Sequence, residues 1–312
     1  MNPAAVAWIS HRECLRHEMG ADHPECPRRL HVIEDRLRAC GLDVFLRHYE
    51  APAATTADLA RVHDRDYIHG ILSAHPGANL LHIDGDTAMN AHTGAAALRA
   101  AGAGLLAVDL VLGGHAAMAF AAVRPPGHHA ERAQAMGFCF FNNVAVAATY
   151  ALTRGVARAA ILDFDVHFGN GTVQILGGHP HLLLCSLHQS RLYPHWRGEG
   201  APSNLVDAPL SAGEGSAALH LAVTDRWLSA LEAFEPELLL VSAGFDAHAQ
   251  DPMSDLRFGF DDYEWIGTVI ERFAAQHCGG RVVAMLEGGY NLDILGPSVE
   301  SFLRPFVGVP RQ

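Results

Sequence analysis

Lysine is absent from this sequence. All 22 of its Lys and Arg positions are Arg, and they face 34 Asp and Glu, which gives a formal net charge of −12. A protein that binds nucleic acid through the phosphates usually carries clustered positive charge. The sequence therefore predicts no nucleic-acid partner.

Cysteine and long hydrophobic runs are also scarce. The six cysteines form no C-x-x-C pair and no regular spacing, so they are expected to be reduced thiols of a cytosolic protein. No uninterrupted apolar run reaches the roughly 20 residues that cross a bilayer. The first residues lack the apolar core and cleavage site of a signal peptide. We therefore expect a cytoplasmic protein without a membrane partner.

Features of disorder are lacking as well. Hydrophobic residues make up 49% of the 312 residues and charged residues 18%, which indicates a compact globular protein. The sequence shows no linker-like change in composition and no internal repeat, so a single domain over 1–312 is predicted.

The order of apolar segments predicts the fold class. Continuous apolar runs suit strands buried on both faces of a parallel sheet, and here they alternate with segments of helical periodicity. The predicted strands are 117–123, 159–166, 182–187, 237–245 and 281–289, and the predicted helices are 92–114, 142–155, 213–234 and 260–278. This alternation predicts an α/β fold with a doubly wound, mainly parallel sheet.

Polar residues follow these strands at their carboxyl ends, where ligands bind in open parallel sheets. The segments that follow are, in order, RPPGHH, DFDVHFGNG, HQ, DAH and GGYN. Five strands thus bring His, Asp and Tyr side chains to one rim. The sequence predicts an active site there.

A metal site is the first expectation for this rim. Asp163, Asp165 and His167 are spaced by two, so on an extended strand their side chains would share one face. Asp246 and His248 have the same spacing after another strand. One imidazole and two carboxylates suit a catalytic divalent ion, above all zinc. One such aspartate alone would more often be a structural residue at a strand end.

Two further features suit proton transfer and oxyanion stabilisation. His128 and His129 follow two prolines and a glycine, whose irregular backbone lets adjacent rings face one pocket. A carboxylate such as Asp163 is the expected orienting partner. Tyr290 lies in a Gly-Gly turn after the last predicted strand, from which its hydroxyl could bond a carbonyl oxygen. A lone His or Tyr would more often be structural.

The motifs as a set resemble the zinc-dependent histone deacetylase superfamily, which includes bacterial deacetylase-like amidohydrolases and acetylpolyamine amidohydrolases. They are HPECPRRL (23–30), RPPGHHA (124–130), GFCFFNN (137–143), DFDVHFGNGT (163–172), SAGFDAH (242–248) and LEGGYN (286–291). They follow the family's order over nearly the whole chain. The resemblance implies an α/β/α sandwich of the arginase and deacetylase type.

The resemblance also implies roles. It assigns one catalytic Zn²⁺ to Asp165, His167 and Asp246, and catalytic roles to His128, His129, Asp163, Asn170 and Tyr290. The second histidine of the pair is generally the base in this family. A structural K⁺ would be held by Asp163, Asp165, His167, Ser186 and Leu187.

The implied substrate channel would be lined by Gly137, Phe138, Tyr193, Met253 and Gly288, with Arg29 near its foot. Tyr193 replaces the more usual Phe, and Phe168 occupies a position that is His in many relatives. Asp84 and Asp86 are the candidates for the rim aspartate that grips the substrate in eukaryotic relatives. Met253 matches a mouth residue that is apolar in lysine deacetylases and Glu in a polyamine-selective relative.

The expected activity is hydrolysis of the N-acyl amide of an acylated lysine peptide or a small acylated amine. An acetylpolyamine amidohydrolase is the alternative within catalysis. A catalytically inactive acyl-lysine-binding protein and an arginase-like dinuclear hydrolase are the others, and an oligomer is possible. The complete set of catalytic residues disfavours the inactive protein, and the single D-x-D-x-H run fits one metal better than two.

Overall fold

The computed structural model describes residues 6–77 and 79–308, so both ends of the predicted domain, 1–5 and 309–312, lie outside the described residues. Its centre is an eight-stranded sheet, in the order β2-β1-β5-β10-β9-β6-β7-β8, in which every neighbouring pair is parallel. The strands are β1 Val6–Ser10, β2 Leu46–Glu50, β5 Met118–Ala121, β6 Ala159–Asp163, β7 Leu182–Gln189, β8 Leu205–Leu210, β9 Leu238–Ala243 and β10 Val282–Leu286.

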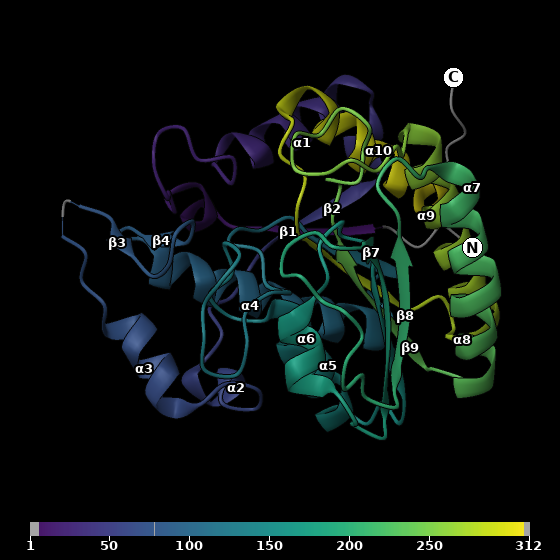
Figure 1. The fold of residues 1–312 in the computed structure, drawn as a ribbon, viewed down its shortest axis with the longest axis horizontal. Helices are drawn as coiled ribbons and strands as arrows, with labels where there is room; N and C mark the ends of the chain where they lie inside the picture. The colour runs from purple at the N-terminus through teal and green to yellow at the C-terminus, as the bar shows by residue number, and fades with distance from the viewer. Residues whose placement is uncertain (1–5, 78, 309–312) are drawn as a thin grey trace.

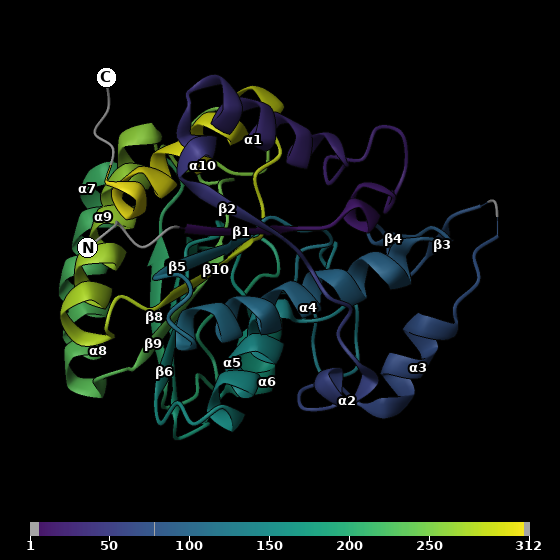
Figure 2. The ribbon, with the colours of Figure 1, turned by 180° about the vertical axis from the view of Figure 1, so that it is seen from behind.

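Helices cover both faces of this sheet (Figures 1 and 2). On one face lie α2 Thr56–Leu59, α3 Arg65–Ser73, α4 Thr93–Leu112, α5 Asn143–Thr153 and α6 Asn170–Leu176. On the other lie α1 Arg28–Ala39, α7 Ser216–Leu221, α8 Ser229–Phe234, α9 Phe260–His277 and α10 Leu292–Val307. The predicted α/β/α architecture is therefore confirmed.

The central strands form because they are apolar along their whole length. Every residue of β5, β6, β9 and β10 is buried, as expected for parallel strands with helices on both faces. These four strands are neighbours in the sheet. Their carboxyl ends therefore lie side by side, and this places the site.

The sequence analysis missed β1, β2 and β8, and two of its predicted elements differ from the structure in more than their exact bounds. The helix predicted over 213–234 consists of α7, a π-helical turn at Ala222–Leu228 and α8. The strand predicted over 159–166 ends at Asp163, so Asp165 and His167 do not stand on an extended strand. The expectation that strand alternation aligns their side chains is wrong, because the chain turns directly after β6.

Short elements complete the fold. The 3₁₀ helices η1 and η2 span Arg12–Leu15 and Leu42–Phe45. An antiparallel hairpin pairs β3 Leu81–His82 with β4 Ala88–Met89. It stands apart from the large sheet.

Helix α4 is long and apolar enough to cross a membrane by length and composition, and it is the one such helix among the described residues. Of its most apolar 18 residues, 61% are buried inside the structure. The helix packs against β1, β5, β10 and α5. Its apolar composition is thus explained by its packing inside the protein.

Candidate active site

The site is built from the segments that follow four neighbouring strands. His128 and His129 follow β5, Asp165 and His167 follow β6, Asp246 follows β9, and Tyr290 follows β10. The predicted convergence at the carboxyl edge of the sheet is what the structure shows.

Asp165, His167 and Asp246 form the candidate metal centre. One ligand atom from each lies within 4.8 Å of the others, and all three residues are buried. The Nδ1 atom of His167 is 3.1 Å from Asp165 Oδ1 and 3.2 Å from Asp246 Oδ2. Apart from this contact with His167, the buried Asp246 Oδ2 has no hydrogen-bond partner within the described structure. A cation at this position would satisfy that oxygen.

Gly288 lets the backbone approach these carboxylates. A Cβ atom at position 288 would lie only 2.0 Å from Asp246 Oδ2. The backbone N–H of Gly288 donates a hydrogen bond to Asp165 Oδ2 at 2.7 Å. The structure thus places Gly288 against the carboxylates of the candidate metal centre. Its hydrogen bond fixes the orientation of Asp165.

The two histidines have different partners. His128 Nδ1 lies 3.0 Å from Asp163 Oδ2, whereas His129 Nδ1 lies 2.7 Å from Asn170 Oδ1. Asn170 Nδ2 donates to Glu131 Oε1 at 2.9 Å, which fixes the orientation of the amide. The His129 Nδ1–H group therefore donates a hydrogen bond to Asn170 Oδ1, and His129 Nε2 is left as an acceptor.

The charges around the histidine pair shift the pKa values of the two rings in opposite directions. Burial alone would lower the pKa of His128, but the carboxylates of Asp165 and Asp163 raise it to about 10. Burial lowers the pKa of His129 well below its usual value, and positive charge at His128 lowers it further. With ring centroids 4.0 Å apart, one histidine favours the charged form and the other the neutral form.

Tyr290 lies in a turn that is held from both sides. Arg29 Nε donates to the Gly289 carbonyl at 2.7 Å, and its guanidinium lies 4.9 Å from the Tyr290 ring centroid. Asp251 accepts the N–H of Tyr290 at 2.7 Å. Burial raises the pKa of Tyr290 well above its usual value. Its hydroxyl therefore stays protonated and able to donate a hydrogen bond at neutral pH.

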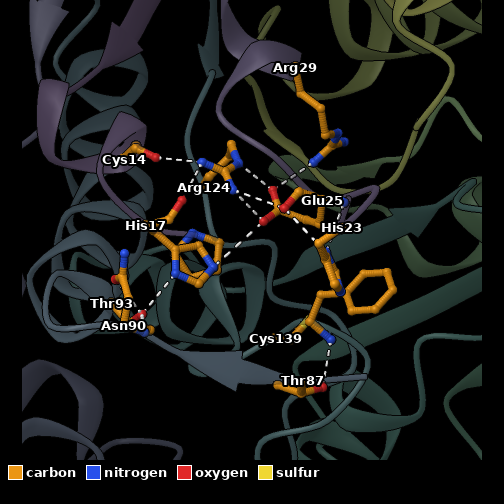
Figure 3. Close-up of polar contacts among 12 residues, drawn as sticks. Cys14, His17, His23, Glu25, Arg29, Thr87, Asn90, Thr93, Arg124 and Cys139 are labelled. Atoms are coloured by element: carbon orange, nitrogen blue, oxygen red, sulfur yellow. Dashed lines mark hydrogen bonds and ion pairs between the residues drawn. The ribbon is translucent and has the colours of Figure 1, made fainter. Parts of the chain in front are cut away.

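Glu25 is a buried carboxylate that contacts both Arg124 and Arg29 (Figure 3). Its carboxylate bonds the Nε and Nη2 atoms of Arg124 and the Nη1 atom of Arg29. Burial would raise the pKa of Glu25, but Arg124 holds it low, at about 2. Glu25 therefore connects Arg124, which lies just before the histidine pair, with Arg29, which bonds the tyrosine turn.

Four predicted channel residues lie close to His129 or Tyr290. Phe138, Met253 and Tyr290 belong to one apolar cluster with Met19, Leu80 and Ala88. The Tyr193 ring centroid is 5.1 Å from that of His129. A Cβ at Gly137, where φ is +55°, would lie 2.5 Å from His129 Cδ2, so the glycine permits close passage beside the histidine.

The remaining predicted residues lie around this centre. Asp84 and Asp86 are exposed in the β3–β4 turn, where Asp84 Oδ1 accepts the N–H of Thr87 at 2.6 Å. Thr87 Oγ1 accepts the N–H of Phe138 at 3.1 Å, so the turn contacts a predicted channel residue. Phe168 stacks on Trp196 with centroids 4.4 Å apart, a packing role.

The predicted K⁺ ligands surround the end of β6. Ser186 pairs with Asp163 across β6 and β7. The Ser186 hydroxyl is buried without a hydrogen-bond partner in the described part of the chain.

Several residues that shape the site were missed by the sequence analysis, namely Glu25, Arg124, Glu131, Asp251 and Glu287. Each of these contacts joins residues at least 39 positions apart in the sequence, so no local spacing indicates them. Three of them lie inside the motifs given above, Glu25 in HPECPRRL, Arg124 in RPPGHHA and Glu287 in LEGGYN, and this was the signal available.

A profile of the histone deacetylase domain matches residues 23–306. The chain belongs to the histone deacetylase family. A rice protein named "Histone deacetylase 10, chloroplastic" is 40% identical over 95% of this chain and 73% of its own length. Human "Polyamine deacetylase HDAC10" is 35% identical over 98% of this chain and 48% of its own length.

The fold agrees with this membership. The crystal structure of the HDA15 HD domain superposes with a TM-score of 0.92 at 30% identity, covering 99% of this chain and 90% of that domain. The resemblance inferred from the motifs is therefore confirmed. Membership makes this chain a hydrolase of the deacetylase family.

Proposed function

We propose that this protein is a zinc-dependent deacylase that hydrolyses the N-acyl amide of lysine-type side chains. The observation that carries the proposal is the meeting of Asp165, His167 and Asp246 with a histidine pair and Tyr290 at one edge of the sheet. Each part of the site supplies one requirement of amide hydrolysis.

The three candidate ligands fit zinc. One imidazole nitrogen and two carboxylate oxygens form a protein donor set typical of catalytic zinc sites, which keep a position for water or substrate. Two observations support this assignment: the buried Asp246 Oδ2 has no partner besides His167, the other candidate ligand, and a hydrogen bond orients Asp165. Bound zinc would supply Lewis acidity toward the amide carbonyl and would lower the pKa of water.

His129 is proposed as the base. Its Nε2, left free by the bond to Asn170, takes a proton from the attacking water while the water oxygen bonds to the carbonyl carbon. The C–N bond then breaks and the leaving nitrogen receives a proton from a histidine. We favour His129 for this return, because His128 is paired with the Asp163 carboxylate, which stabilises its positive charge.

Tyr290 is proposed to donate its hydroxyl hydrogen bond to the carbonyl oxygen as negative charge develops there. The raised pKa of its phenol keeps the proton in place. Arg29 and Asp251 hold the tyrosine backbone, so the donor requires little reorganisation during the reaction.

The K⁺ assignment is also a proposal. The unpartnered Ser186 hydroxyl beside Asp163 supports it. A monovalent cation there would be bound next to the carboxylate that orients His128, so its role would be structural.

Lysine-type substrates are favoured by the mouth of the channel. Met253 lies among apolar side chains and offers no carboxylate to pair with the second ammonium group of a polyamine. Acetylpolyamine hydrolysis is the second candidate, because a relative is named a polyamine deacetylase and the charge of −12 attracts cations.

The test is a parallel turnover assay of the zinc-reconstituted protein on acyl-lysine peptides, acetylputrescine and acetylspermidine. We expect the peptides to be hydrolysed at least as efficiently as the polyamines, judged by kcat/KM. A much larger kcat/KM for acetylspermidine that persists at high salt would favour the polyamine alternative. Absence of turnover on every acylated amine would contradict the proposal.

A further inference from the structure

We propose that Asp251 is a positioning residue for Tyr290, one that fixes the tyrosine backbone relative to the loop that carries Asp246. This inference rests on the role proposed above for Tyr290. It adds a residue to which neither the motifs nor the comparisons assign a role.

Asp251 is a buried carboxylate, 5% exposed, that is devoted to backbone groups. Its Oδ2 accepts the N–H of Tyr290 at 2.7 Å and that of Asn291 at 3.0 Å. Its Oδ1 accepts the N–H of Met253 at 3.1 Å. Within the described residues, no arginine or histidine forms an ion pair with it. Burying a carboxylate is costly unless it is hydrogen-bonded, and here the compensating bonds come from three backbone N–H groups. We infer that the carboxylate fixes the positions of these groups.

The loop that carries Asp251 also carries the candidate metal ligand Asp246. The loop is short and bonded within itself: the Asp251 N–H donates to the His248 carbonyl at 2.8 Å, and Ser254 Oγ donates to the Asp246 carbonyl at 2.7 Å. Through Asp251, the backbone of Tyr290 is therefore tied to the residue that would bind the metal.

Other contacts hold the turn on either side of Tyr290 but not at its N–H; after it, Asn291 Nδ2 donates to the Gln250 carbonyl at 2.7 Å. Arg29 bonds the carbonyls of Glu287 and Gly289, which precede Tyr290. Gly289 has φ of +117°, and glycine is the residue that restrains the backbone least. Among the described residues, the Tyr290 N–H itself is bonded by Asp251. Without Asp251, the tyrosine can shift about the glycine while Arg29 keeps its bonds.

Such a shift would affect the rate more than substrate binding. A misplacement of about 1 Å costs on the order of 10²-fold in rate when a group must meet a reacting atom. Asp251→Asn keeps the shape but has one acceptor oxygen, so either the Tyr290 pair or Met253 loses its partner. We expect kcat to fall at least about tenfold, with KM and zinc content nearly unchanged.

The experiment is a double-mutant cycle on the zinc-loaded protein with an acetyl-lysine peptide. It compares wild type, Asp251→Asn, Tyr290→Phe and the double variant. If Asp251 acts through the Tyr290 hydroxyl, Asp251→Asn should lower kcat strongly in the wild type and by less than about twofold once the hydroxyl is gone. Asp58→Asn is the matched control, because Asp58 accepts the N–H of Thr55 at 2.8 Å at the start of α2. It should leave kcat unchanged.

The outcomes distinguish failure of the positioning role of Asp251 from failure of the proposed function. Equal losses in both backgrounds, unchanged kcat in Asp251→Asn, or loss of zinc would overturn the positioning role. Unchanged kcat in Tyr290→Phe would instead refute the proposed function. Asp251→Glu keeps the charge but moves it by one methylene, and it serves as the second variant if Asn does not fold; the same pattern is expected.

Discussion

The Glu287 carboxylate accepts the backbone N–H of Gly127 at 2.7 Å and so joins the end of β10 to the segment that carries the histidine pair. The same Oε2 atom accepts the N–H of His128 at 3.2 Å, and Ser242 Oγ donates to Oε1 at 3.1 Å. Burial raises the pKa of Glu287 to about 7. The histidines are thus placed by a residue of the tyrosine motif.

Removal of this acceptor should destabilise the protein. Glu287→Ala leaves two buried N–H groups without a partner, and each such group costs about 1–3 kcal/mol. Glu287→Gln retains one acceptor oxygen, so its free energy of unfolding should fall by less than that of Glu287→Ala. Urea unfolding of both variants measures the difference. Equal stability of the alanine variant and the wild type would contradict the account.

Asp163 at the end of β6 and Asp246 after β9 should differ in their effect on zinc. Asp246→Ala removes a proposed ligand and should lower zinc stoichiometry directly. Asp163→Ala should mainly disturb His128 and the proposed K⁺ site, and a loss of an orienting partner of this kind costs about 10–100-fold in affinity or activity. Zinc per chain, measured after dialysis, should fall in the first variant and largely persist in the second. Equal retention would show that the two roles are assigned wrongly.

Met253 should control the choice between lysine-type and polyamine substrates. Met253→Glu places a carboxylate at the channel mouth beside Phe138 and Tyr290. The kcat/KM ratio should shift toward acetylspermidine by about 1 kcal/mol, the scale of a partly exposed ion pair. Met253→Gln, which adds polarity without charge, is the control. A shift of the same size in both variants would mean that charge is not the cause.

Acid should destabilise the fold through His63. Its Nδ1 lies 2.9 Å from the Glu131 carbonyl, and its Nε2 accepts the N–H of Asn142, the N-cap of α5. Protonation would break the second bond, and burial lowers the pKa of His63 from 6.5 to about 4. The unfolded chain therefore binds the proton first as pH falls, so the contribution is complete above about pH 6.5 and is lost toward pH 4.

The measurement is the pH dependence of the free energy of unfolding in wild type and His63→Asn. Between pH 6.5 and 4 one such histidine adds up to about 1.4 kcal/mol per pH unit to the slope. The variant should show a smaller slope by up to that amount. An identical slope would show that His63 is not held neutral.

The central strands could be located from the sequence because each is an apolar run followed by polar residues. Their predicted ends at 123, 166, 245 and 289 lie two or three residues beyond the observed ends at 121, 163, 243 and 286. The strand after Pro236, for example, becomes β9 and leads directly to Asp246. The residues that hold the site could not be found in this way. Glu25 meets Arg124 across 99 positions and Asp251 meets Tyr290 across 39, and these contacts depend on how separate loops fold together. The D-x-D-x-H run indicated the correct cluster for a wrong reason, since the strand ends at Asp163.

The most direct test of the central claim is the turnover of an acetyl-lysine peptide by zinc-loaded Tyr290→Phe compared with wild type. The account predicts a folded variant with full zinc content and kcat lowered by about 10² or more, the scale for removal of one oxyanion donor. Restoration of wild-type activity by zinc after chelation should accompany this result. Near wild-type kcat in a folded, zinc-loaded Tyr290→Phe protein would contradict the account.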